Sequence, residues 1–128
     1  ITSTLATGTA PLAVTSTTVN ANLNAEQHNG LKVKVIDIGD WNMDLTTSVS
    51  IAHGLTLSSI RSIDIIIRND ADTAYYPFNY GGAGGTAGSY YITATNAVLT
   101  RLTSGDFDST TFDSTSYNRG WVTIWYVP

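Results

Sequence analysis

The ten residues IRSIDIIIRN (Ile60–Asn69) carry the clearest strand signal in the chain. Side chains alternate between the two faces of a strand, so Ile63, Ile65 and Ile67 share one face. β-Branched residues crowd a helix but suit a pleated sheet, and the run is therefore predicted to be a strand with one core-facing side. The charged residues inside the run argue against a membrane-spanning segment.

Shorter apolar runs lie on both sides of this strand and are separated by glycine, asparagine and aspartate. Gly81–Gly88 is predicted to be a loop, as is the polar stretch Ser104–Asn118 with its three aspartates. The spacing of the runs is typical of an antiparallel β-sandwich, so we predict an all-β fold of about seven strands. The other predicted strands are Lys32–Ile38, Val49–Ala52, Tyr75–Tyr80, Tyr90–Ala94, Ala97–Leu102 and Gly120–Val127.

Composition excludes several classes of protein. Only 12% of the 128 residues are charged and the net charge is −4, so the basic surface that nucleic acid or anionic lipid requires is absent. With no cysteine, disulfides are excluded. The abundance of Thr, Ser, Gly and Tyr is typical of an extracellular β-rich protein. The chain begins at Ile1 without a signal-peptide pattern, and we expect it to be a fragment of a longer protein.

The first 30 residues differ from the remainder. They contain no aromatic residue, one charge and only sparse apolar residues, which suit a segment that identical copies wrap around each other. We therefore predict an extended segment over residues 1–30, through which identical copies associate, and a globular domain over residues 31–128. Asn24–Gln27 has the pattern of a helix start and Asn29-Gly30 of a stop, which predicts one helical turn.

The last predicted strand, GWVTIWYV (Gly120–Val127), is apolar on both faces. A small antiparallel sandwich buries only one face of each sheet. The second face is therefore expected to be covered by another chain, by the N-terminal segment or by a ligand. The predicted oligomer-interface residues are Leu12, Val14, Val19, Leu23, Trp121 and Trp125.

The aromatic residues around the glycine-rich loop are the best functional lead. Tyrosine presents a flat apolar face and a polar edge, which suit the C–H faces and hydroxyls of a sugar. Polar partners are expected from neighbouring loops. The predicted ligand-binding residues are Tyr75, Tyr76, Tyr80, Tyr90, Asp70, Asp72 and Arg119. The competing interpretation is that about half of the aromatic residues are core or subunit contacts.

Metal binding and catalysis find little support. His28 and His53 are the only histidines, and no zinc-binding spacing exists, so His53 is read as a turn residue. Asp70 with Asp72, and Asp106 with its neighbours, lack the pattern of a calcium loop and are read as solvated turns. No paired carboxylates or GxSxG elbow are evident. We predict no cofactor, no metal and no enzymatic activity.

Residues Thr7–Gly30 resemble a segment of bacteriophage tail-fibre and other tail-appendage proteins. Thr7-Gly8-Thr9-Ala10-Pro11 and Asn22-Leu23-Asn24-Ala25 match that pattern, whereas Glu26–Gly30 is more polar than the family's Asp-Leu-Leu-Asp-Gly. The rest of the chain is similar to the globular modules that end such proteins and, more distantly, to H-type lectin sandwiches, which are trimers.

This resemblance implies a homotrimeric fibre tip in the virion, which contacts other virion proteins and a host cell-surface receptor such as a glycan. A structural adaptor or decoration protein is the alternative, and a small polysaccharide hydrolase is the third hypothesis. No nucleic-acid partner and no membrane insertion are expected.

Overall fold

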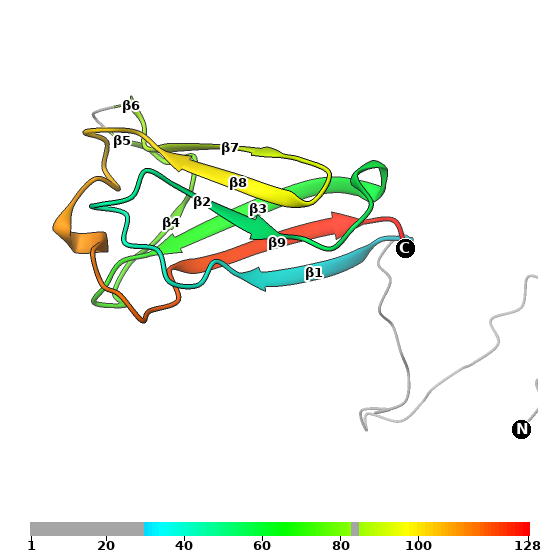
Figure 1. Ribbon diagram of the computed structural model, residues 1–128, viewed down its shortest axis with the longest axis horizontal. Helices are drawn as coiled ribbons and strands as arrows, with labels where there is room; N and C mark the ends of the chain where they lie inside the picture. Colours follow the sequence, from blue (N-terminus) through cyan, green and yellow to red (C-terminus); the bar gives the residue numbers. More distant parts are fainter. Residues whose placement is uncertain (1–29, 83–84) are drawn as a thin grey trace, which may run out of the picture.

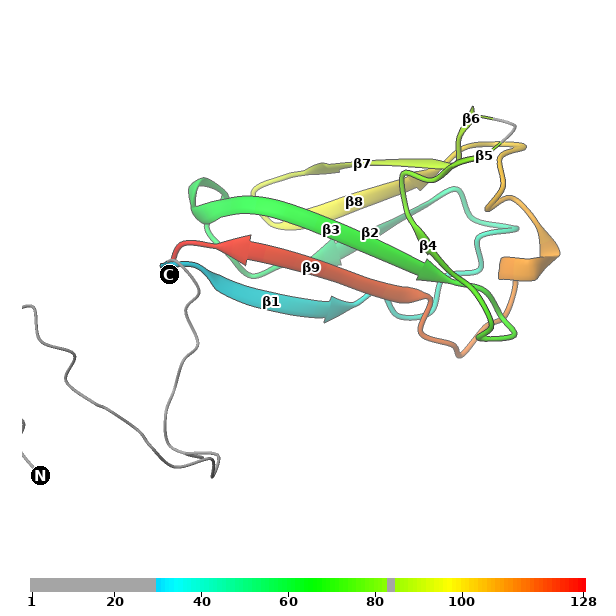
Figure 2. The same cartoon turned by 180° about the vertical axis from the view of Figure 1, so that it is seen from behind.

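The computed structural model describes residues 30–82 and 85–128. These residues form two layers of antiparallel sheet (Figures 1 and 2), which confirms the predicted all-β, sandwich-like fold. One sheet has the strand order β1 (Lys32–Asp37), β9 (Gly120–Tyr126), β3 (Ile60–Arg68) and β4 (Tyr75–Pro77). The other has the order β2 (Ser48–Ala52), β8 (Asn96–Arg101) and β7 (Gly88–Ile92).

Helical structure in the described part of the chain is limited to two short 3₁₀ turns, η1 (Leu57–Ser59) and η2 (Thr110–Phe112). None of the described helical residues forms a segment long and apolar enough to cross a membrane. Two predictions for the N-terminal segment concern residues outside those described. They are its helical turn and the interface residues Leu12, Val14, Val19 and Leu23.

Strand β3 has the predicted core-facing side. Ile65 and Ile67 are buried and Ile63 is partly buried against the core, while Asp64 on the opposite face is exposed. The strand pairs with β9 on one side and β4 on the other. The predicted strand Tyr75–Tyr80 is shorter in the structure, because the Tyr80 amide turns back to the Pro77 carbonyl (2.9 Å).

The core between the sheets is aliphatic along the strands and aromatic at the end that carries η2. Phe107 is stacked on Phe78 with ring centroids 5.8 Å apart, and Phe112 meets Phe107 edge-on at 5.2 Å. Both Phe107 and Phe112 belong to the predicted polar loop Ser104–Asn118, which is therefore anchored in the core rather than only solvated. Burying two phenylalanines supplies the free energy that orders this loop.

The prediction that Gly81–Gly88 is a loop needs correction. Gly81–Gly82 (β5) pairs with Gly85–Thr86 (β6) as a small ribbon, and β7 already begins at Gly88. Close packing requires glycine at position 88, because a Cβ there would lie 2.5 Å from the Phe78 ring. A backbone without side chains can therefore lie directly on the aromatic end of the core.

The outer face of the four-stranded sheet is unusually apolar. Strand β1 turns Val33 and Val35 outward, with 46% and 60% of their surface exposed. Val33 pairs with Trp125 of β9, while Ile66 of β3 pairs with Trp121. Thus the two tryptophans of the last strand lie on the outer face as expected. Each has one apolar and one polar cross-strand neighbour, Val33 and Ser62 for Trp125, and Ile66 and Asp37 for Trp121.

Candidate functional site

A cavity of about 320 Å³ opens at the aromatic end of the sandwich, between the β4–β5 segment and the loop that carries η2. This volume falls in the range of small-molecule sites, about 300–1,000 Å³. Two tyrosines of different depth contribute to it, because Tyr76 is half-buried and Tyr80 is exposed. The lining residues are Tyr76, Tyr80, Gly82, Asp106, Phe107, Ser109, Thr111 and Phe112.

The apolar part of the cavity is a rigid aromatic cluster. Tyr76 meets Phe107 and Phe112 edge-on, with ring centroids 6.2 and 6.0 Å away. Tyr80 packs edge-on against Tyr76 at 5.5 Å. Because Phe107 and Phe112 are buried, they hold Tyr76 in place, and the cluster presents pre-ordered ring surface to a ligand.

Three polar side chains of the cavity have no partner among the described residues, whereas the Ser109 hydroxyl accepts the Thr111 amide (3.2 Å). Within residues 30–82 and 85–128, neither the hydroxyls of Tyr76 and Tyr80 nor the Asp106 carboxylate has a hydrogen bond or an ion pair. Asp106 lies against the backbone of Gly82, because a Cβ added to Gly82 would be 2.2 Å from the Oδ2 atom of Asp106. The cavity therefore combines an aromatic wall with a carboxylate and two hydroxyls that can serve a ligand.

Of the predicted ligand-binding residues, the structure places only Tyr76 and Tyr80 at this cavity. Tyr75 lies on the other face of β4, where its hydroxyl donates to Asp72 (2.7 Å) and its ring meets Trp121. Tyr90 lies on β7 beside a separate cavity of about 110 Å³, and its hydroxyl is 3.4 Å from the Ile63 carbonyl oxygen.

Asp72 belongs to the same surface as Tyr75, away from the cavity. The hydrogen bond from Tyr75 and the ion pair with Arg68 (3.1 Å) outweigh desolvation and lower the pKa of Asp72. The same hydrogen bond raises the pKa of Tyr75. The guanidinium of Arg68 also lies over the Tyr117 ring, so Arg68 connects the turn after β3 with the segment before β9.

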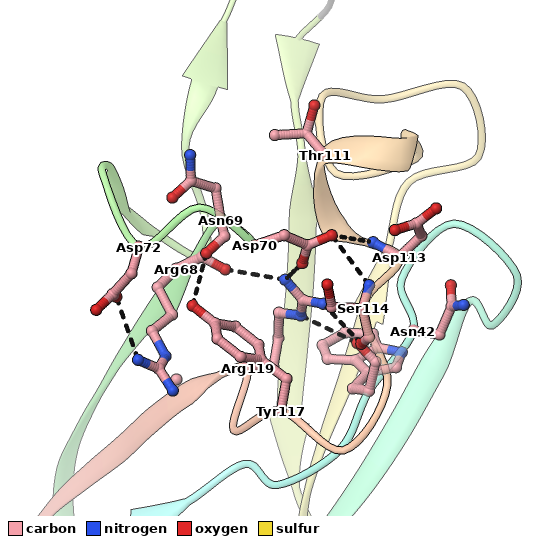
Figure 3. Close-up of polar contacts among 12 residues, drawn as sticks. Asn42, Arg68, Asn69, Asp70, Asp72, Thr111, Asp113, Ser114, Tyr117 and Arg119 are labelled. Atoms are coloured by element: carbon pink, nitrogen blue, oxygen red, sulfur yellow. Dashed lines mark hydrogen bonds and ion pairs between the residues drawn. The ribbon is translucent and has the colours of Figure 1, made fainter.

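Arg119 and Asp70 were predicted to contact a ligand, but the structure gives both internal partners (Figure 3). The Arg119 side chain is fully buried and pairs with Asp70 Oδ1 at 2.6 Å. It also donates to three backbone carbonyls, those of Trp41 (3.0 Å), Arg68 (3.1 Å) and Ser114 (3.2 Å). Arg119 therefore joins three segments of the chain at one end of the sandwich: the β1–β2 loop, the end of β3 with the turn after it, and the stretch before β9.

The other oxygen of Asp70 accepts the backbone amides of Asp113 (2.9 Å) and Ser114 (3.0 Å). Burial tends to raise the pKa of Asp70, but the hydrogen bonds from Arg119 and Ser114 and the charge of Arg119 outweigh it, so the pKa is lowered. For Asp113, burial and the nearby Asp70 and Asp44 carboxylates raise the pKa. Arg119 and Asp70 therefore hold the η2 loop, which lines the cavity, in place; we call this pair the polar clamp.

The described residues contain no group of three His, Cys, Asp or Glu side chains that could hold a metal ion. His53 is buried, and both ring nitrogens are occupied: Nδ1 accepts the Leu55 amide (3.1 Å) and Nε2 lies 3.1 Å from the Thr93 carbonyl oxygen. This pairing is that of a neutral structural histidine with the proton on Nε2.

Sequence reasoning missed Asp106 as a cavity residue, together with the two phenylalanines beside it. The available signal was the position of Phe107 and Phe112 inside an otherwise polar loop. Large apolar residues at such positions indicate that a loop returns to the core, and Asp106 then necessarily lies at the edge of that core.

Searches with protein-family models, curated proteins and solved structures find no match to this chain.

Proposed function

We propose that this chain is a tip module of a bacteriophage tail fibre, a homotrimer that binds a host cell-surface glycan without catalysis. The observation that carries the proposal is the cavity in which the ring surfaces of Tyr76 and Tyr80 lie beside the Asp106 carboxylate, which has no partner among residues 30–82 and 85–128. The resemblance of Thr7–Gly30 to tail-fibre segments supports a virion location and contact with other virion proteins.

The cavity chemistry suits a saccharide. Aromatic rings pack against the C–H faces of a sugar, and a carboxylate can accept hydrogen bonds from its hydroxyls. Gly82 allows the carboxylate of Asp106 to lie close to the ring of Tyr80, so that one sugar residue could touch both groups. The rigid phenylalanines behind Tyr76 reduce the entropy lost on binding.

Binding without catalysis is favoured by the number of carboxylates. Glycoside hydrolysis ordinarily requires two, about 5 to 9.5 Å apart across the scissile bond. Asp106 is the single carboxylate among the described lining residues of the cavity. The nearby Asp108 is paired with Arg101 at 2.9 Å, so it is committed to the fold.

The apolar outer face of the four-stranded sheet supports assembly from copies of this chain. Val33 and Val35 are exposed on the edge strand, beside Trp121 and Trp125. The preceding residues 1–29 join the chain directly before β1, so a segment that gathers three copies would bring these faces together. Exposed apolar residues gathered on one sheet face are typical of a surface that contacts another protein chain.

A structural adaptor or decoration protein is the second candidate, and this same outer face favours it. The two functions differ in their prediction for the cavity, because an adaptor needs the sheet face but no free ligand site. Light scattering on the full chain tests the shared assembly step: a trimer agrees with both candidates, and a monomer contradicts the homotrimer.

Tyr80→Ala tests the binding function. Removing the exposed ring should weaken binding to host cells or to an immobilised host glycan roughly tenfold or more, which corresponds to about 1.4 kcal/mol per factor of ten. Tyr91→Ala is the matched control, because Tyr91 is 60% exposed on β7 and does not line the cavity. Equal binding by both variants and the unchanged protein, with the fold intact, would contradict the proposal.

A further inference from the structure

We infer that the cavity selects a neutral saccharide and rejects sugars that carry a carboxylate or a phosphate. This inference rests on the proposed glycan-binding function and specifies its ligand class. It is carried by the charges around the cavity and by the free carboxylate of Asp106.

Among the described lining residues of the cavity, none is a cation that could pair with an anionic sugar. All six Lys and Arg residues of the chain lie in the described part, and none of them lines the cavity. The two arginines nearest to its lining loop are already neutralised. Arg101 pairs with Asp108 at 2.9 Å and is 4% exposed, while Arg119 pairs with Asp70 at 2.6 Å and is fully buried.

The remaining four cations lie on other surfaces. Lys32 and Lys34 belong to β1, which is the opposite edge of the sheet from β4, and the Lys34 ammonium donates to the His53 carbonyl oxygen. Arg61 is exposed at the start of β3 and donates to carbonyls of that corner. Arg68 pairs with Asp72 on the outer face of the sheet.

The Asp106 carboxylate therefore sets the sign of the charge at the cavity. It is exposed, lies against Gly82 beside the Tyr80 ring, and has no partner within the described residues. An ionised carboxylate only accepts hydrogen bonds, so it needs donors from the ligand, and neutral sugars supply hydroxyls. A ligand carboxylate in the same position would face a like charge without compensation.

The size of the discrimination follows from Coulomb's law. Two like charges a few ångströms apart near a protein surface repel strongly enough to weaken binding roughly tenfold or more. Because Asp106 is exposed, added salt should screen the repulsion and narrow the difference. The aromatic wall contributes equally to both kinds of sugar and so does not affect the ratio.

The experiment measures binding of the full chain to matched pairs of immobilised oligosaccharides, each pair differing only in a terminal hexose or the corresponding uronic acid. The unchanged protein should bind the neutral member of its preferred pair at least about tenfold more tightly. Asp106→Asn should bring the affinities for the neutral and the acidic saccharide closer together, and Asp106→Lys should make the acidic saccharide the tighter ligand. Asp37→Asn is the charge-matched control, since Asp37 is exposed on β1 at the other edge of the sheet.

Each result has a distinct consequence. Equal binding of neutral and acidic members, or a ratio that Asp106→Lys leaves unchanged while the fold is intact, overturns the inference but not the glycan-binding function. Binding to none of the saccharides, with cell binding that Tyr80→Ala does not affect, overturns the proposed function and the inference with it. If Asp37→Asn changes the ratio of neutral to acidic affinity as much as Asp106→Asn does, the selectivity comes from the net charge of the protein, and the inference is overturned.

Discussion

Replacing Arg119 with methionine tests whether the buried polar clamp holds the cavity end of the sandwich together. Methionine retains much of the length of the side chain but none of its donors. The change removes four hydrogen bonds, one to the carboxylate of Asp70 and three to the carbonyls of Trp41, Arg68 and Ser114. These acceptors come from three segments of the chain: the β1–β2 loop, the end of β3 with the turn after it, and the stretch between η2 and β9.

The expected loss follows from what remains unpaired. Breaking a buried ion pair by removing one partner costs about 3–5 kcal/mol. We expect the lower end, about 3 kcal/mol, because the Asp70 side chain is 18% exposed and retains the amides of Asp113 and Ser114. That is a large share of a total stability of roughly 5–15 kcal/mol. It corresponds to a fall in Tm of roughly 12–24 °C for a domain of about 100 residues.

Acid provides a second readout. Since the pKa of Asp70 is below its ordinary value of 3.8 in the folded protein, its ionised form stabilises the fold above that value, and the contribution is lost as the pH falls through the folded pKa. Without Arg119 the pKa should return toward the ordinary value. The variant should therefore lose less stability than the unchanged protein between about pH 4 and pH 2.

Urea unfolding followed by tryptophan fluorescence measures both effects, because Trp41 is buried and accepts from Arg119 through its carbonyl. Arg61→Met is the control: Arg61 is exposed and donates only to nearby backbone carbonyls, so the change should stay within about 0.5 kcal/mol. A loss below about 1 kcal/mol for Arg119→Met, or an unchanged acid dependence, would refute the clamp.

Two further predictions concern backbone and charge at the same end of the molecule. Gly120→Ala should lower stability by more than about 2 kcal/mol in urea unfolding, because Gly120 has φ +152° and its Cβ would lie 1.9 Å from the Ile66 carbonyl oxygen. A loss under about 0.5 kcal/mol would contradict this packing. In NMR titration, Asp113 should titrate above its ordinary pKa, and Asp70→Asn should lower that pKa by removing a neighbouring charge. An Asp113 pKa that does not change with Asp70→Asn would exclude their coupling.

The strands could be predicted because their signals are local. The alternation of β3 and the β-branched residues within it are properties of ten consecutive residues, and the observed strand Ile60–Arg68 agrees with them. The same holds for the last strand, whose two apolar faces were visible in Gly120–Val127. The glycine-rich segment was misread because most of its residues are glycine and give no strand pattern. Phe78 and Asp106, which pack against Gly88 and Gly82, are not part of that segment.

The candidate site was only partly predictable from sequence. Tyrosines on both sides of the glycines were identified as a group, but adjacent residues of a strand face opposite ways, so Tyr75 and Tyr76 reach different surfaces. Which of the two meets a ligand cavity depends on the loop that covers that face. Asp106 comes to the cavity from 30 positions beyond Tyr76, and no local pattern connects them.

By itself, therefore, the sequence determined a sparsely charged, cysteine-free, all-β chain with an apolar last strand, because composition and strand periodicity are read directly from the residues. Only the tertiary structure decided that Arg119 has internal partners and that Asp106 has none in the part of the chain that the structure describes. A charged side chain in a loop can point to solvent or into the fold. The choice depends on whether carbonyls and a carboxylate from distant loops converge to satisfy it, as they do around Arg119.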